Sequence, residues 1–123
     1  MELKNIVCSK EWAEKLKVAG WPQDVGLFSW ASYQDDNGVK RWTIYFGHDK
    51  ADWADEHYAA PTGTELGMVI VKGEYKTPRH LWGEGWYFGE HDGYFDSESD
   101  ARAAQVCWML EQKIITPEEI GRW

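Results

Sequence analysis

The stretch LFSWASYQDDNGVKRWTIYF, from Leu27 to Phe46, contains the clearest structural pattern in the chain. Aromatic and β-branched residues lie on both sides of Asn37-Gly38, a pair that tolerates the positive φ of a tight hairpin turn. The pattern predicts two antiparallel strands, Leu27–Gln34 and Val39–Phe46. Because strand faces repeat with period two, one face of each strand is expected to meet the other over the core. The side chains on those faces are Phe28, Trp30, Trp42, Ile44 and Phe46.

Helix signals lie on both sides of this hairpin. Ser9 is a typical N-cap residue ahead of a helix predicted over Lys10–Ala19, and Gly20 is suited to end it. Thr62 begins a capping box ahead of a second helix, predicted over Gly63–Val71. The intervening segment 48–60 is compatible with a short helix or with an acidic surface loop.

The C-terminal half predicts a second hairpin and a long helix. An aromatic strand is expected over Leu81–Glu90, a turn at Asp92-Gly93, and a short returning strand over Tyr94–Asp96. Ser97 is the expected cap of the last major helix, and Thr116 opens one further helical turn. The apolar stripe of that helix contains Ala103, Val106, Cys107, Leu110 and Ile114.

Together these elements predict an α+β fold in one domain over residues 1–123. The order is helix, hairpin, helix, hairpin, helix, with a mostly antiparallel sheet of about four strands packed on three helices. A chain of this length is the size of one ordinary domain.

Nine Trp and six Tyr residues among 123 predict a core built on indole rings more than on aliphatic side chains. Four tryptophans lie near loops, termini or glycines, and some of them are expected at the surface, where aromatic side chains concentrate binding energy; the alternative is a structural role for all nine. This second group is Trp21, Trp53, Trp82 and Trp123. Trp53 and Trp82, with the acidic residues Glu90 and Asp92, are the candidate partner-binding residues.

The charge of the chain points away from nucleic acid. The formal net charge is −8, and the segment from Glu84 to Asp100 carries six acids with no Lys or Arg. Binding to phosphate backbones needs clustered cations, so we expect no affinity for DNA or RNA and instead a protein partner with a basic patch. No stretch approaches the roughly 20 apolar residues of a membrane span, so no membrane partner is expected.

Cys8 and Cys107 are expected to be free thiols, because the chain has the features of a cytoplasmic protein. Cys8 precedes a helix, and a helix N-terminus lowers a thiol pKa, which predicts faster reaction at Cys8 than at Cys107. No motif predicts a cofactor. The acidic cluster His48, Asp52, Glu56 and His57 would hold a divalent ion if this segment were helical, and this gives an alternative as a small metal-dependent enzyme.

Three stretches, 8–23, 60–70 and 86–115, together resemble a group of small proteins encoded by bacteriophages and prophages. The group shows a Cys-led first helix, a Thr-x-x-Glu-Leu-Gly helix and an acid-capped last helix with Ala-Arg-Ala. The ending is also similar to phage α-β-α sandwich domains. The resemblance implies a fold, a phage accessory role in a bacterial cytoplasm and no agreed activity. We therefore expect a non-catalytic protein acting through protein–protein contact, with an acidic nucleic-acid decoy as another alternative.

Overall fold

A computed structural model of the protein describes residues 6–47, 53–89 and 93–122. The described helices and strands are α1 (Lys10–Ala19), β1 (Phe28–Gln34), β2 (Lys40–Phe46), β3 (His57–Ala59), α2 (Gly63–Lys72), β4 (Arg79–Leu81), β5 (Gly85–Tyr87), α3 (Glu98–Glu111) and α4 (Pro117–Arg122). The predicted α+β class is confirmed. The strands form two small antiparallel sheets, ordered β2-β1-β3 and β4-β5, where the sequence predicted one larger sheet.

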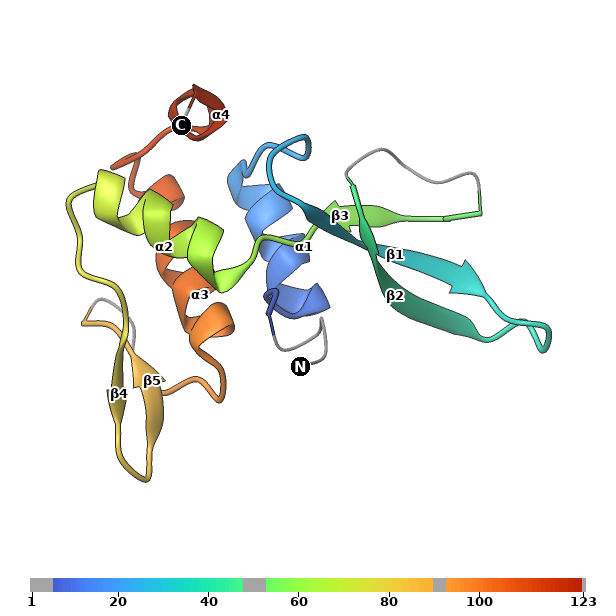
Figure 1. The fold of residues 1–123 in the computed structure, drawn as a ribbon, viewed down its shortest axis with the longest axis horizontal. Helices are drawn as coiled ribbons and strands as arrows, with labels where there is room; N and C mark the ends of the chain where they lie inside the picture. The colour runs from blue at the N-terminus through green and yellow to red at the C-terminus, as the bar shows by residue number, and fades with distance from the viewer. Residues whose placement is uncertain (1–5, 48–52, 90–92, 123) are drawn as a thin grey trace.

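The three longer helices form a layer from which the two sheets extend in different directions (Figure 1). Helix α3 packs against both α1 and α2. The three-stranded sheet extends from the α1 side, where β3 packs against α1, and the β4–β5 hairpin lies beside the first turns of α3. We call α1, α2 and α3 together the helical layer.

The helix ends form as their local sequence predicts. The Ser9 hydroxyl accepts the Trp12 N–H at 3.4 Å, and α1 ends at Gly20. Thr62 makes both hydrogen bonds of its capping box with Glu65. Ser97 accepts the Asp100 N–H at 3.1 Å, and Thr116 forms the equivalent box ahead of α4.

The core lies within the helical layer and is mainly aliphatic, so the prediction of an indole-based core is wrong. Trp21, predicted among the surface candidates, is the one described tryptophan that is fully buried, at 2% exposure. Trp12, Trp30, Trp42 and Trp108 are only partly buried. Small and aliphatic residues allow the helices to approach closely, and indoles then cover the edges. The largest aliphatic side chains of the core are Leu16, Leu66, Ile70, Met109, Ile115 and Ile120.

The stretches 8–23, 60–70 and 86–115 contact one another directly across the helical layer. The Ser9 N–H donates to the Asp100 carboxylate at 2.7 Å, and the Arg102 guanidinium donates to the Gly63 carbonyl at 2.7 Å. A Cβ at Gly67 would lie 2.5 Å from the Arg102 Nη1 atom, so glycine leaves room for this arginine. These hydrogen bonds therefore fasten α3 to the beginnings of α1 and α2.

The first hairpin forms where predicted, with Phe28 opposite Phe46 and Gln34 opposite Lys40. The Asp35 carboxylate orders the turn by accepting the N–H groups of Asn37 and Val39, both at 2.9 Å.

The strand faces of that hairpin do not all meet over the core as predicted. Trp30 packs against the core, but Phe46 is 75% exposed and contacts Phe28 edge-on. The reason is that α1 packs against β3, whereas β2 lies at the opposite edge of the sheet.

The segment between β2 and α2 contains a strand that sequence reasoning missed. Residues 48–52 lie outside the described residues. Residues 53–56 are not helical, and they lead into β3. Strand β3 pairs with β1, and the Ser32 hydroxyl accepts the Glu56 N–H at 3.0 Å just before it. The central strand β1 thus supplies backbone and side-chain partners that local propensity does not reveal.

The second hairpin turns earlier than predicted. A turn at 82–84 interrupts the strand expected over 81–90, so β5 lies within that span, whereas β4 ends where the strand was expected to begin. Gly83 and Gly85 have φ of +83° and +127°, a region that side chains disfavour, so the glycines permit the reversal here. The predicted returning strand remains as one bridge between Trp86 and Phe95, with hydrogen bonds of 2.9 and 2.8 Å. Asp92 of the predicted turn lies outside the described residues.

Candidate functional site

The predicted metal-binding cluster is not assembled in the part that the structure describes. Glu56 lies 3.2 Å from the Lys40 ammonium, and His57 lies in β3 opposite Ala31. His48 and Asp52 lie outside the described residues. Over residues 6–47, 53–89 and 93–122 no group of three potential metal ligands occurs. The helical spacing that suggested the cluster is wrong over 53–59, because the chain there is extended or turning.

The cysteines are free thiols, but their predicted order of reactivity has no basis in the fold. Cys8 has no exposed surface, and burial raises the pKa of its thiol well above the ordinary value, with the Asp100 charge adding to the effect. Burial also raises the pKa of Cys107 to about 12. At Cys8, burial therefore affects the thiol pKa more than the nearby helix N-terminus does. Neither thiol is suited to act as a nucleophile.

The two described partner-binding candidates lie beside different sheets. Trp53 is 51% exposed and contacts Tyr33 and Tyr45 edge-on, with ring centroids 6.1 and 5.8 Å apart. Trp82 is 92% exposed in the turn between β4 and β5. Trp53 contacts β1 and β2, whereas Trp82 lies in the β4–β5 turn, and these two sheets extend from the helical layer in different directions (Figure 1). Glu90 and Asp92 lie outside the described residues.

The described acids of the 84–100 segment are partly engaged within the protein. Glu98 forms an ion pair with Arg102, and Asp100 is half-buried against the Ser9 N–H. Burial raises the Asp100 pKa, although its hydrogen bonds with Ser9 oppose the change. Because these two carboxylates interact within the protein, they do not support a continuous acidic surface that would imitate nucleic acid.

A groove with a mainly apolar lining lies between α1 and α3, and sequence reasoning did not identify it. Its volume is about 740 Å³. We call it the α1/α3 groove. Its lining residues are Glu11, Trp12, Glu14, Lys15, Val18, Ala19, Ala104, Cys107, Trp108 and Glu111.

The groove exists because small side chains alternate with large ones at helical spacing. Ala104 and Cys107 are 3% and 5% exposed and lie at its bottom, whereas Trp12 and Trp108 are partly exposed at its sides. Val18 adds an apolar side chain that is 86% exposed. The sequence signal was the breadth of the apolar stripe of α3, which Ala104 and Trp108 widen.

The rim of the groove is acidic. Glu11, Glu14 and Glu111 line it together with one cation, Lys15, whose ammonium lies 4.3 Å from the Trp12 ring centroid. Lys10 lies 4.0 Å from both Glu11 and Glu14, in exposed contacts that screen these acids only in part. The groove thus combines an apolar bottom with a net negative rim.

Comparison of the chain with protein-family models, curated proteins and solved structures finds no match. Among the described residues, no helix is both long and apolar enough to cross a membrane. Function is therefore inferred from the chemistry of the surfaces.

Proposed function

We propose that this protein is a non-catalytic binding module whose α1/α3 groove receives a short amphipathic helix with basic side chains from a partner protein. The apolar, acid-rimmed groove is the observation that carries this proposal. The resemblance of three stretches to small phage and prophage proteins supports an accessory role in a bacterial host.

The shape of the groove favours a helical partner. Two helices bound it, and α1 has 10 residues, which corresponds to a length of roughly 15 Å. A partner helix of about three turns would present apolar side chains at spacings of i, i+3, i+4 and i+7 along that length. The volume of about 740 Å³ accommodates several such anchors. Small residues at the bottom leave the space that those anchors would fill.

The rim favours basic side chains on the partner. Three carboxylates face one lining cation, and the whole chain carries a net charge of −8. Opposite charge at a rim accelerates association and suppresses acidic competitors more than it adds affinity. Binding by a basic helix is therefore expected to be salt-dependent in its association rate.

The buried thiols argue against catalysis by a cysteine nucleophile. A nucleophilic cysteine needs a lowered pKa and access to substrate, whereas the pKa of both thiols is raised and both are buried. Cys107 lies at the bottom of the groove as a small apolar side chain.

A titration with model helices tests the proposal at roughly 0.15 M salt. The probe is an amphipathic Leu/Lys helix of about 16 residues, long enough to span α1. A Leu/Glu helix removes the basic charge, and a Ser/Lys peptide removes the apolar face. We expect saturable binding of the Leu/Lys helix and at least about tenfold weaker binding of the other two, a difference of about 1.4 kcal/mol.

Charge-reversed variants locate the binding. Glu14→Lys with Glu111→Lys is expected to weaken Leu/Lys binding at least about tenfold. The matched control, Asp36→Lys with Glu118→Lys, makes the same total charge change at exposed positions outside the groove lining. Equal loss in both double variants, or no binding to the wild type, contradicts the proposal.

A further inference from the structure

Gln105 of α3 holds a buried acceptor that lacks a donor. The residue is 1% exposed, and its amide nitrogen donates to the Lys76 carbonyl at 2.8 Å. Because a carbonyl oxygen can only accept, this bond fixes which end of the amide faces Lys76. The Oε1 atom on the other side has no hydrogen-bond partner among the described residues. Buried acceptors are almost always satisfied, so a donor is expected at this position.

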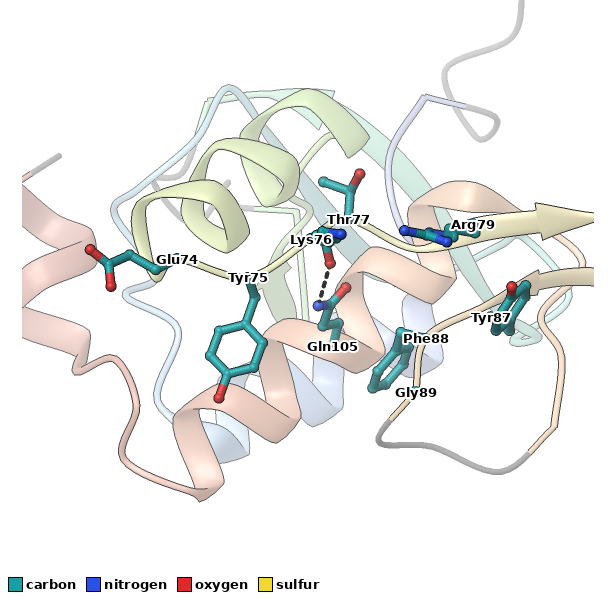
Figure 2. A pocket seen from close by; sticks show the side chains of 9 residues that line it. All are labelled: Glu74, Tyr75, Lys76, Thr77, Arg79, Tyr87, Phe88, Gly89 and Gln105. Carbon is teal, nitrogen blue, oxygen red and sulfur yellow. Dashed lines mark hydrogen bonds between the residues drawn. The ribbon is translucent and has the colours of Figure 1, made fainter.

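Gln105 lines a hollow of about 430 Å³ that is bounded by the segment 74–79, by residues 87–89 at the end of β5 and by α3. Figure 2 shows Gln105 rising from α3 between Tyr75 and Phe88, below the segment that carries Lys76 and Arg79. We call this hollow the Gln105 pocket. It lies outside the α1/α3 groove, with which it shares no lining residue.

Aromatic rings bound the inner part of the pocket and hold their positions through other aromatic contacts. Phe88 is 5% exposed and stacks on Phe95, with centroids 6.2 Å apart. Tyr75 contacts Trp108 edge-on, with centroids 5.6 Å apart. A flat ring entering the pocket would therefore meet preformed apolar surfaces beside a single neutral acceptor.

The charged lining residues are more exposed and lie toward the mouth. Lys76 and Arg79 are exposed and supply two cations, against one acid at Glu74. In a chain with a net charge of −8, this local excess of cations favours an anionic group. The pocket thus pairs an inner acceptor with a basic mouth.

We propose that the Gln105 pocket binds a small aromatic anion that carries a neutral O–H or N–H donor. The donor bonds to the Gln105 Oε1 atom, the ring lies between Tyr75 and Phe88, and the anionic group interacts with Arg79 and Lys76. The anion is a carboxylate or a phosphate, which share this charge and this hydrogen-bonding role.

Ligand-observed NMR titrations with four probes test this inference. Para-hydroxybenzoate and para-hydroxyphenyl phosphate carry the donor, and para-fluorobenzoate and para-fluorophenyl phosphate replace it with an atom of similar size that cannot donate. We expect saturable binding of at least one hydroxyl probe and at least about tenfold weaker binding of its fluoro partner. The stronger hydroxyl probe identifies the carboxylate or the phosphate as the preferred anion.

Two variants connect that preference to the pocket. Gln105→Met keeps the side-chain length, removes the acceptor and is expected to abolish the preference for hydroxyl over fluoro. Arg79→Ala, at an exposed position, is expected to weaken all four probes and leave the preference unchanged. Equal binding of hydroxyl and fluoro probes to the wild type, or no binding of either hydroxyl probe, overturns the proposal without relying on any variant.

Discussion

The helical layer and the two hairpins differ in where their large apolar side chains lie. Leu66 in α2 has no exposed surface, whereas Phe46 at the end of β2 is 75% exposed and Trp82 between β4 and β5 is 92% exposed. The buried side chains of β1 are instead small, at Ser29, Ala31 and Ser32. The buried apolar core therefore lies mainly in and around the helices, and the hairpins display large aromatic side chains at the surface.

The largest expected difference between these regions concerns truncation of an apolar side chain. Leu66→Ala is expected to lower the free energy of unfolding by about 2–5 kcal/mol, because it leaves a cavity in the core. Phe46→Ala removes a larger side chain, yet it should cost under about 1 kcal/mol because most of that ring already contacts water. Urea denaturation of both variants checks this. A greater loss from Phe46→Ala would show that the sheet contributes more stability than the helical layer.

A helix cap gives the next largest expected effect. Ser97→Ala removes the acceptor of the Asp100 N–H at the start of α3, and should cost about 1 kcal/mol. Ser97→Asp, which keeps an acceptor at this position, is the control and should retain most of the wild-type stability. Thermal unfolding checks the pair, and equal stability of Ser97→Ala and wild type would contradict the assigned cap.

Two carboxyl groups, one in each region, should titrate in opposite directions. Burial raises the pKa of Asp100 in α3, whereas N–H donation from Val39 and an ion pair with Arg41 lower the pKa of Asp35 in the first hairpin. The folded state therefore favours protonated Asp100, whose ionisation costs stability as the pH rises through its folded pKa. Ionised Asp35 contributes stability that is lost as the pH falls through its folded pKa.

Carboxyl-carbon NMR titration measures both groups. We expect Asp100 to titrate above the ordinary aspartate range and Asp35 below it. Asp100→Asn keeps an acceptor for the Ser9 N–H and removes the charge, so its stability advantage over wild type should shrink as the pH falls toward about 4. If the stability advantage of Asp100→Asn over wild type grew as the pH fell, the raised pKa assigned to Asp100 would be wrong.

The smallest expected effect belongs to Trp82. Trp82→Ala should change the free energy of unfolding by less than about 0.5 kcal/mol, because the indole is 92% exposed in a turn. The same substitution at the buried Trp21 should be severely destabilising, which makes it the matched comparison. Similar losses at the two positions would show that the turn indole is buried in solution.

The elements that sequence predicted well are those whose signals are local. Each helix cap joins two residues that are three positions apart, so both partners can be identified in the same short stretch of sequence. The capping residues are Ser9, Thr62, Ser97 and Thr116. The α+β class followed from these helices and from the first hairpin turn.

The features that sequence missed depend on contacts between distant segments. Strand β3 forms because β1, some 26 residues earlier, offers a partner at Ala31 for His57. The pKa of Cys8 depends on its depth in the folded protein, which the adjacent helix does not reveal. The α1/α3 groove requires Trp12 and Ala104 to lie on two packed helices. Neither residue, taken by itself in the sequence, indicates that a groove forms.

The indole N–H signals of the tryptophans offer the most direct test of the proposed binding surface, since these residues lie in both regions. The Leu/Lys helix is titrated into protein labelled with ¹⁵N while the assigned indole resonances are followed. Binding in the α1/α3 groove predicts saturable shifts of Trp12 and Trp108, which line it, with Trp53 beside the first hairpin and Trp82 in the β4–β5 turn unchanged. Shifts of Trp53 or Trp82 with Trp12 and Trp108 unmoved would contradict the account and place the binding surface on the hairpins.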